Sequence, residues 1–285
     1  MKWLRVAEPT PIRKALEREG LWAKKSLGQH FLLDLNLTRR IAKSAGDLED
    51  QIVIEVGPGP GGLTRALIES DAARIIAIEK DARFLPILAE LIPFSENRLE
   101  VYEGDALEAD EPGLLAGKQA HIISNLPYNV GTPLLIKWLK ADPAWRGPMT
   151  LMLQKEVAER IVAKPGDDAY GRLAVIAQAR CNVRYGFTVH AHAFTPPPKV
   201  DSAIVHLETR ADFYEHLDAL ERVTAAAFGQ RRKMLRQSLS ALAEEVGMPS
   251  AMLLTRAGVT PTARAEEIGR EGFIALAELV RASGL

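Results

Sequence analysis

Residues 52–62 read Ile-Val-Ile-Glu-Val-Gly-Pro-Gly-Pro-Gly-Gly, and this segment decides the fold expected of the chain. A short run of β-branched residues that ends in turn residues is typical of a buried parallel strand. The glycines permit a sharp turn and a close approach of the backbone to a ligand. Residues 63–68 then indicate a helix, whose unpaired N–H groups would point back at that ligand. The segment therefore predicts a nucleotide-like ligand at the carboxyl end of the first strand.

An acidic residue, Glu79, follows the next predicted strand at residues 74–78. A carboxylate in that place can accept hydrogen bonds from both hydroxyls of a ribose. The glycines at 57, 59 and 61 are spaced more closely than in the dinucleotide-binding pattern Gly-x-Gly-x-x-Gly. Because the acid suits NAD and S-adenosylmethionine equally, this region indicates a nucleoside cofactor without deciding between the two.

The composition excludes several classes of protein. The chain has 285 residues, 47% hydrophobic and 26% charged, which suits one large and one smaller globular domain. Its net charge of −1 means that any basic surface must be local. Cys181 is the sole cysteine, and His190 and His192 have no third ligand nearby in the sequence, so neither a disulfide nor a metal site is expected. No apolar run approaches the ~18 residues of a membrane span and no signal-peptide pattern opens the chain, so we expect a cytoplasmic protein.

The predicted elements divide the chain into three parts. Residues 1–24 form an extension, with a short helix that places Ile12 and Leu16 on one side. Strands and helices then alternate through residues 25–209, as in a Rossmann-like α/β domain. Strand patterns end near residue 211, so residues 210–285 are expected to form an all-helical domain.

The boundaries of the expected elements follow from the apolar periodicity and the turn residues. Strands are expected at residues 52–56, 74–78, 99–103, 121–124, 149–154, 181–189 and 203–207, the last two able to pair antiparallel with each other. Residues 24–32 look too irregular for a strand. Helices are expected at residues 34–45, where Asp34 would be the N-cap, and at 63–68, 81–92, 130–140, 155–163, 172–179, 216–228, 231–246, 250–257 and 271–282.

The tetrapeptide Asn125-Leu126-Pro127-Tyr128 follows the fourth predicted strand and indicates the chemistry. The exocyclic amino group of a nucleobase is a poor nucleophile because its lone pair is delocalised into the ring. The Asn125 side-chain oxygen and the Leu126 carbonyl could hold both N–H groups and align that nitrogen with a methyl donor. Pro127 would make the turn rigid, and the Tyr128 ring offers a face on which a base can stack. The alternative, a polar turn with an incidental aromatic residue, is less consistent with this place in a nucleoside-binding sheet.

Three further residues each have a functional and a structural interpretation. Asp105 follows the third strand and could accept a hydrogen bond from an adenine amino group, or be an ordinary turn residue. His30 is either a loop residue or a group that closes over the cofactor. Phe194 precedes a proline-rich loop, residues 195–199, which would fix Phe194 and Lys199 in place. Phe194 is then either a core residue or a second wall for the base.

Two basic segments are candidates for contact with RNA phosphates. Residues 230–236 contain four cations and no acid, and the predicted helix at 231–246 would place Arg232, Lys233 and Arg236 on or beside one face, with Leu235 and Leu239 toward the core. Residues 1–46 hold ten Lys or Arg against four Asp or Glu. A solvated helix face is the alternative for either segment.

The chain resembles the adenine-N6 dimethyltransferases of small-subunit ribosomal RNA, the bacterial kasugamycin-sensitivity type. The resemblance covers the chain from about residue 24 to the end and rests on several segments. They are KSLGQHFL (25–32), VIEVGPGPGGL (53–63), Glu79-Lys80-Asp81, Gly104-Asp105-Ala106, NLPY (125–128), EVAERIVAKPGDDAYGRL (156–173), FTPPPKVDS (194–202) and FGQRRKMLRQSL (228–239). Many family members carry Asn at the position of His30.

The resemblance implies a Rossmann-like class I methyltransferase sheet with a small helical domain, and S-adenosylmethionine as the methyl donor. Its implied donor contacts are His30, Leu32, Gly57, Gly59, Glu79, Lys80, Asp105, Ala106 and Asn125. Residues 125–128 and Phe194 would hold the target base, and no metal would be needed. The implied RNA contacts are Lys24, Lys25, Lys199, Arg231, Arg232, Lys233 and Arg236, with residues 210–285 as the RNA-binding domain.

The implied target is a pair of adjacent adenosines in a hairpin loop near the 3′ end of 16S rRNA, each methylated twice during late assembly of the small subunit by a monomeric enzyme. Two alternatives remain at this point. A related enzyme that methylates large-subunit rRNA shares the cofactor motifs, although FGQRRKMLRQSL resembles the small-subunit family. An RNA-binding assembly factor on a methyltransferase fold would lack activity, against which the intact residues 125–128 argue.

Overall fold

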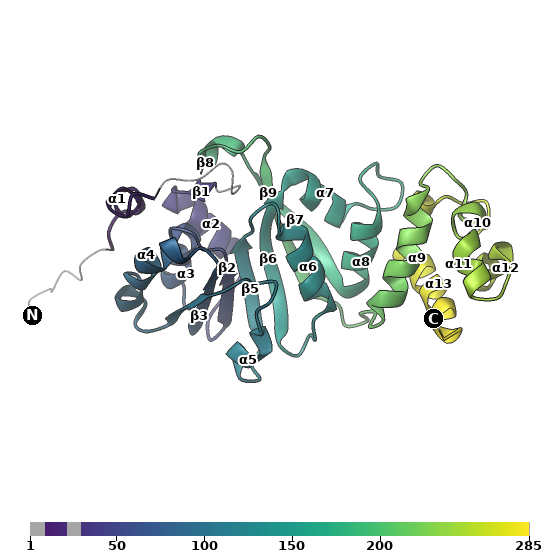
Figure 1. Ribbon diagram of the computed structural model, residues 1–285, viewed down its shortest axis with the longest axis horizontal. Helices are drawn as coiled ribbons and strands as arrows, with labels where there is room; N and C mark the ends of the chain where they lie inside the picture. The colour runs from purple at the N-terminus through teal and green to yellow at the C-terminus, as the bar shows by residue number, and fades with distance from the viewer. Residues whose placement is uncertain (1–8, 22–29, 285) are drawn as a thin grey trace, which may run out of the picture. The chain divides into compact units, whose positions relative to one another are not determined.

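The computed structural model describes residues 9–21 and 30–284 of the chain (Figure 1). The chain folds into two compact units. The first consists of Met1–Lys155 with Gly186–His206, and the second of Glu156–Tyr185 with Leu207–Leu285. The second unit therefore includes residues 156–185 in addition to the C-terminal helices that the sequence groups into a domain of their own.

A seven-stranded sheet has the strand order β4-β3-β2-β5-β6-β9-β7. Its strands are β2 (Ile52–Val56), β3 (Arg74–Glu79), β4 (Leu99–Glu103), β5 (Ala120–Asn125), β6 (Arg146–Gln154), β7 (Cys181–Val189) and β9 (Ser202–Thr209). The pairs β3–β4, β2–β3, β2–β5 and β5–β6 are parallel. The seven predicted strands are thereby confirmed, although β6 begins at Arg146, before the predicted residue 149.

The strand order reverses at β2, since β3 lies on one side of it and β5 on the other. In open parallel sheets such a reversal leaves a crevice at the carboxyl ends of the two strands, and ligands bind there. Every residue of β2 is buried, which explains why the strand is apolar except for Glu55. The predicted cofactor segment therefore ends at this crevice.

The helices of the first unit are α1 (Ile12–Arg18), α2 (Leu35–Ser44), α3 (Gly62–Ile68), α4 (Leu85–Ala89), α5 (Glu111–Leu115) and α6 (Gly131–Lys140). The Asp34 side chain accepts hydrogen bonds from the N–H groups of Asn36 and Leu37, which confirms it as the N-cap of α2. The single helix predicted at 81–92 is wrong. The 3₁₀ turns η2 (Ala82–Phe84) and η3 (Ile92–Ser95) flank the short α4 instead, and Pro86 and Pro93 each lack the N–H that a continuous helix needs.

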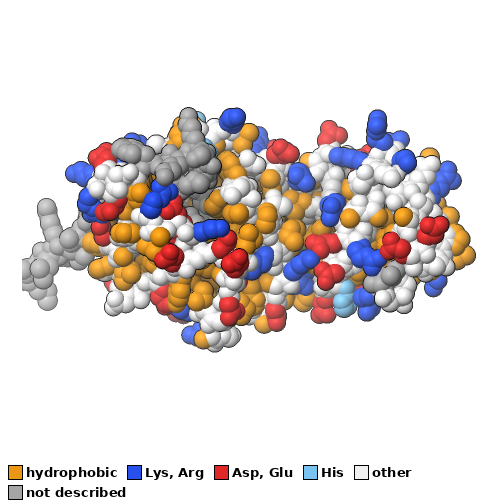
Figure 2. Space-filling model, viewed as in Figure 1, with side chains coloured by type: hydrophobic (Ala, Val, Ile, Leu, Met, Phe, Trp, Pro, Cys, Tyr) orange, Lys and Arg blue, Asp and Glu red, His pale blue; other side chains and the backbone are white. Residues whose placement is uncertain are grey.

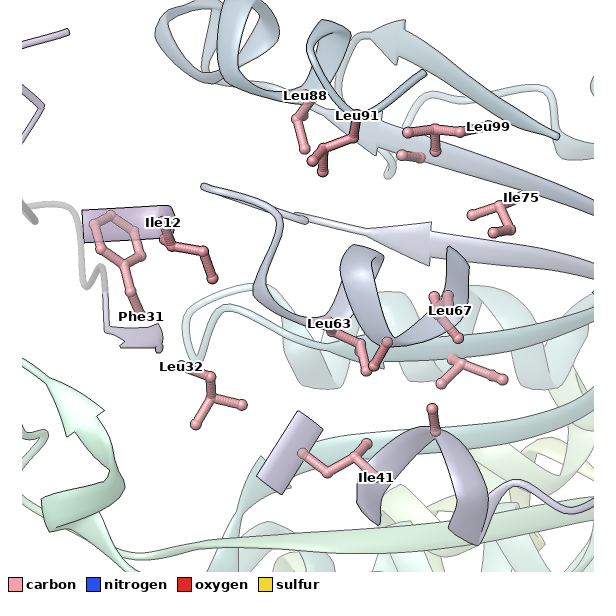
Figure 3. Close-up of a cluster of buried hydrophobic side chains, with 14 of the residues drawn as sticks. Ile12, Phe31, Leu32, Ile41, Leu63, Leu67, Ile75, Leu88, Leu91 and Leu99 are labelled. Atoms are coloured by element: carbon pink, nitrogen blue, oxygen red, sulfur yellow. The ribbon is translucent and has the colours of Figure 1, made fainter. Parts of the chain in front are cut away.

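The core of the first unit collects side chains from α1, β1, α2, α3, β3 and α4 (Figure 3). Ile12 and Leu16 are buried in it, as predicted for the N-terminal helix. No strand is expected within residues 24–32; residues 24–29 lie outside the described part of the chain, and the expectation is wrong for Phe31 and Leu32. Strand β1 (Phe31–Leu32) pairs antiparallel with β8 (Phe194–Thr195), because both supply buried aromatic residues to the same cluster.

The helices of the second unit are α7 (Lys155–Val162, from its second residue), α8 (Arg172–Arg180), α9 (Leu217–Gly229), α10 (Leu235–Ser238), α11 (Ser240–Glu245), α12 (Ser250–Arg256) and α13 (Arg270–Ala282). Their core includes Phe273, which is fully buried and whose ring centroid lies 5.4 Å from that of the partly buried Phe228. None of the described helices combines the length and the apolarity required to cross a membrane.

The helix predicted at 231–246 is wrong, because the chain turns at residues 230–234 before α10 and α11. The N–H groups of Leu235 and Arg236 donate to the carbonyls of Ala263 and Pro261, at 2.7 and 3.2 Å, rather than to carbonyls of the preceding turn. These contacts to another loop interrupt the helix. Leu235 and Leu239 are nevertheless fully buried, as predicted.

Candidate active site

A cavity of about 630 Å³ lies in the first unit at the carboxyl ends of β2, β3, β4 and β5. Its lining draws on segments that are distant in the sequence, from residue 30 to residue 194. Every residue expected to contact the donor or the target base lines it, namely His30, Leu32, Gly57, Gly59, Glu79, Lys80, Asp105, Ala106, Asn125, Leu126, Pro127, Tyr128 and Phe194. The fold thus brings the two predicted groups together, and their individual roles remain predictions.

The glycine turn after β2 depends on glycine at two positions. Gly59 has a φ of +53°, a left-handed conformation that residues with a side chain rarely adopt. A Cβ atom on Gly62 would lie 2.3 Å from the carbonyl oxygen of Leu32, so α3 and β1 can approach this closely only without it. Gly57, Gly59 and Gly62 line the cavity, as do Pro58 and Pro60 of the same turn.

Glu79 ends β3 and is fixed by the same turn. Its Oε2 accepts from the N–H of Gly59 at 2.9 Å and its Oε1 from the N–H of Asp81 at 2.7 Å. The side chain is buried, and this burial raises the pKa of the carboxyl above its usual range. A carboxylate oxygen can accept more than one hydrogen bond, so both oxygens keep capacity for the hydroxyls of a ribose.

Asp105 lies after β4, and its contacts fit the turn interpretation, while its role toward adenine stays a prediction. Its Oδ1 accepts from the N–H of Leu107 at 2.9 Å, as in an ordinary Asx turn. Its Oδ2 pairs with the Nζ of Lys80 at 2.7 Å, and the hydrogen bond from Lys80 lowers the pKa of the Asp105 carboxyl. Asp105 also lines the cavity, so its carboxylate is available there as a hydrogen-bond acceptor.

The turn at residues 125–128 leaves β5 at the floor of the cavity. Leu126 is buried, and its N–H donates to the carbonyl of Met152 on β6 at 3.2 Å, which fixes the backbone of the turn. A Cβ atom on Gly57 would lie 3.4 Å from the Pro127 ring, so the glycine turn and this turn are in contact. The Tyr128 hydroxyl lies 2.7 Å from Oγ of Ser202.

His30, which directly precedes β1, and Phe194 in β8 border the same cavity. Nδ1 of His30 lies 2.8 Å from the carbonyl oxygen of Pro196, and since a carbonyl can only accept, Nδ1 carries the proton. The His30 ring centroid is 5.9 Å from that of Tyr128. Phe194 is 3% exposed and belongs to the hydrophobic core, so it is a core residue that also lines the cavity.

Glu55 is a lining residue to which the sequence analysis gave no role. It is 1% exposed within β2, and burial raises the pKa of its carboxyl to about 8. Its Oε2 has no hydrogen-bond partner among the described residues. A charged residue inside an apolar strand just before a glycine turn was the available signal. Phe84 from η2 also lines the cavity, and its sequence context carries no comparable signal.

The candidate RNA contacts, unlike the residues of the cavity, do not share one environment. Lys24 and Lys25 lie outside the described residues, and Lys199 is exposed. Arg231 pairs with Glu266 at 2.6 Å and donates to the Asp168 carbonyl at 2.8 Å, both within the second unit.

The other three cations of the segment, Arg232, Lys233 and Arg236, are exposed. Their predicted common helix face does not exist, because residues 230–234 form a turn. On the face of the molecule shown in Figure 2, Lys and Arg side chains are interspersed with Asp and Glu. Within the described ranges, no three His, Cys, Asp or Glu residues are grouped so that they could hold a metal ion.

The comparisons with known proteins point to one family. The model for ribosomal RNA adenine dimethylase matches residues 20–281. The ribosomal RNA small subunit methyltransferase A of Phenylobacterium zucineum is 61% identical over 269 residues, which cover 94% of this chain and 91% of that protein. The protein of the same name from Caulobacter vibrioides is 62% identical over 257 residues, or 90% of this chain and 96% of its own.

Solved structures agree with this result. A dimethyladenosine transferase from Plasmodium falciparum is similar with a TM-score of 0.78 and 27% identity, over 90% of this chain and 99% of that chain. The 23S rRNA methyltransferase ErmE is similar with a TM-score of 0.65 and 27% identity, over 88% of this chain and 99% of that chain. The predicted methyltransferase fold and the family inferred from the motifs are both confirmed. The chain belongs to the ribosomal RNA adenine dimethylase family.

Proposed function

We propose that this protein transfers methyl groups from S-adenosylmethionine to N6 of two adjacent adenosines near the 3′ end of 16S rRNA, in the assembling small ribosomal subunit. The names of the relatives that are more than 60% identical support the small subunit as substrate. The observation that carries the proposal is the meeting of the glycine turn, Glu79 and residues 125–128 in one cavity.

The residues of the cavity fit this donor. Glu79 offers a carboxylate to the ribose hydroxyls, and Asp105 offers an acceptor to the adenine amino group. Gly57, Gly59 and Gly62 line the cavity and have no side chain that could limit the approach of a ligand. Glu55 supplies a buried acid, one oxygen of which has no hydrogen-bond partner in the described part of the chain, and this suits a ligand that carries positive charge. When bound, S-adenosylmethionine supplies an electrophilic methyl group on a sulfonium.

The protein's own task is to position the nitrogen that attacks. We infer that the Asn125 side-chain oxygen and the Leu126 carbonyl accept the two N–H groups of the adenine N6, so that its lone pair points to the donor. Both acceptors also stabilise the positive charge that develops on the amine. Tyr128 and Phe194 line the space in which a base removed from its stack would be held, and that removal costs about a few kcal/mol.

We further propose that residues 210–285 contact the rRNA backbone through Arg232, Lys233 and Arg236, which are exposed cations in one turn and the helix after it. Arg231 would contribute less, because its guanidinium already pairs with Glu266. We also propose that Lys199, at the connection that follows β8, contacts RNA beside the cavity. A monomeric, metal-free, cytoplasmic enzyme completes this proposal.

The test is methylation of under-methylated small subunits with a labelled donor, followed by mapping of the modified bases. Label on two adjacent adenosines near the 3′ end of 16S rRNA would support the proposal. Parallel reactions with large subunits address the alternative suggested by the similarity to ErmE, since label in 23S rRNA alone would replace the small-subunit assignment. Binding to small subunits without any label would favour an assembly factor.

A further inference from the structure

Tyr128 is held by a residue that lies outside the cavity. Its hydroxyl is 2.7 Å from Oγ of Ser202, the first residue of β9, and Ser202 is fully buried. In the sheet, β6 separates β5, which leads to Tyr128, from β9. One hydrogen bond therefore connects the turn after β5 to a strand two places away.

The position of Ser202 is itself fixed by its neighbour Asp201. The Asp201 carboxylate accepts from the N–H of Ala191 at 2.9 Å and lies 3.1 Å from Nδ1 of His190. The Asp201 carbonyl accepts from the N–H of Lys155 at 2.9 Å. The backbone beside Ser202, the partner of the Tyr128 hydroxyl, is thus fixed by contacts with residues 190–191 and with Lys155.

The same connection, residues 196–202, also holds the other ring that faces Tyr128. The Pro196 carbonyl binds Nδ1 of His30, and the rings of His30 and Tyr128 are 5.9 Å apart with an angle of 34° between their planes. Both rings line the cavity, while the polar groups that orient them come from this connection. Because the Tyr128 hydroxyl is already engaged with Ser202, the ring rather than the hydroxyl is what the target base would meet.

We infer that Ser202 is a positioning residue for methyl transfer, whose buried hydroxyl fixes the Tyr128 ring at the angle required to stack the target adenine. The inference rests on the proposed function, because it needs a base in the cavity. Loss of the hydrogen bond leaves the Tyr128 ring free to tilt, so the base is held less well while the donor site is untouched. The expected loss in kcat/KM for the RNA substrate is about 3- to 10-fold, the range of one neutral hydrogen bond.

The experiment is a double-mutant cycle on methylation of under-methylated small subunits, with Tyr128→Phe, Ser202→Ala and the double variant. Each single variant should raise KM for the subunits and lower kcat/KM by a similar factor, and the double variant should lose no more than either. The dissociation constant for S-adenosylmethionine should stay that of the wild type. Ser95→Ala is the matched control, because Ser95 is a buried serine with its own hydrogen bond to Leu99, away from the cavity.

Three results would overturn the inference. One is a double variant whose loss in kcat/KM equals the product of the losses in the two single variants. Another is a loss in Tyr128→Phe far larger than in Ser202→Ala, which would assign the hydroxyl a direct role in the reaction. The third is a Ser202→Ala protein that matches Ser95→Ala in thermal stability and retains full kcat/KM, which would make Ser202 merely structural. A wild-type protein that methylates no small subunit would instead reject the proposed function, so the two failures are distinguishable.

Discussion

At the scale of single residues, the acids that line the cavity have different surroundings and therefore different pKa shifts. Glu79 and Glu55 are buried acids, and burial raises the pKa of both carboxyls. Asp105 has a lowered pKa because Lys80 donates to it. These acids surround a space that we assign to a cationic cofactor, so cofactor binding should be coupled both to hydrogen bonding and to protonation.

Glu79→Ala should weaken the binding of S-adenosylmethionine by about ten- to a hundredfold, the usual range for hydrogen bonds to a charged group. Calorimetric titration gives the dissociation constant. Glu79→Gln, which keeps one acceptor oxygen, should lose less. Thermal unfolding serves as the control, since Glu79 also accepts from Gly59 and Asp81. An unchanged dissociation constant in a folded Glu79→Ala protein would refute the ribose contact.

Glu55 should release a proton when the donor binds. With a pKa of about 8, most of its carboxyl is protonated at pH 7 in the free protein. A positively charged ligand favours the carboxylate and lowers that pKa, so binding should release most of one proton. Titration calorimetry at pH 7 in two buffers of different ionisation enthalpy measures this release, and Glu55→Gln should lack it. Equal binding heats in the two buffers for the wild type would contradict the prediction.

At the scale of elements, the sequence is most informative where local pattern and tertiary structure agree. The apolar runs of β2 and β3 predict their strands because each is buried in the parallel sheet. The N-cap Asp34 predicts the start of α2 because its interactions are local. The part of the cavity that follows β2, β3, β4 and β5 also could be predicted from the sequence, since the carboxyl ends of parallel strands meet at one edge of a sheet.

The predictions from the sequence are wrong where contacts with a distant segment determine the backbone conformation. Residues 230–234 turn because Leu235 and Arg236 bond to residues 261–263, which no helical periodicity reveals. The pairing of β1 with β8 likewise joins segments more than 160 residues apart. The hydrogen bond between Tyr128 and Ser202 has the same character, because it depends on the order of β5, β6 and β9 in the sheet.

His121, Thr150 and His206 form a buried polar cluster at the centre of the sheet. We predict from it that the folded state loses stability in acid. His121 on β5 lies 3.1 Å from the Thr150 hydroxyl, which lies 3.1 Å from His206, and burial lowers the pKa of His121 to about 4. A lowered imidazole pKa means that the folded state prefers the neutral ring. The resulting stability is present above about pH 6.5 and is lost as the pH falls toward 4.

Between pH 7.5 and 5, His121 should therefore cost the wild type about 2 kcal/mol of unfolding free energy. Denaturant unfolding of the wild type and of His121→Gln at both pH values measures the difference. The variant, whose side chain at this position does not titrate, should lose less stability over the same interval. An identical loss in both proteins would show that His121 does not determine the pH dependence.

The exposed cations Arg232, Lys233 and Arg236, in the turn at residues 230–234 and the start of α10, are called the basic turn here. They give a second prediction at this scale. Changing Arg232, Lys233 and Arg236 together to Ala should weaken binding to the small subunit and flatten its salt dependence by about 0.7–0.9 in log–log slope per lost phosphate contact. Arg231→Ala should have a smaller effect on the slope, because Arg231 pairs with Glu266. Lys118→Ala, a change at an exposed cation of the first unit, is the control. A triple variant with the slope of the wild type would show that these cations are solvated and do not contact RNA phosphates.

At the scale of the whole molecule, the two units divide the proposed tasks. The entire cavity is lined by the first unit, whereas the basic turn belongs to the second. Donor binding and RNA binding should therefore be separable by mutation, and the triple variant of the basic turn should keep the affinity of the wild type for S-adenosylmethionine. The second unit also includes α8 and the loop before it, where the Tyr170 hydroxyl donates to the carbonyl of Ile268 at 3.0 Å.

The central claim is that residues 125–128 hold the N6 amino group of an rRNA adenosine beside the donor. Its most direct test compares wild type and Asn125→Ala in the methylation of under-methylated small subunits, with the two adenosines near the 3′ end of 16S rRNA analysed by mass spectrometry. We predict dimethylation of both by the wild type and a rate lower by roughly 10²–10³ in Asn125→Ala, with S-adenosylmethionine still bound. Turnover near that of the wild type in Asn125→Ala would contradict the account.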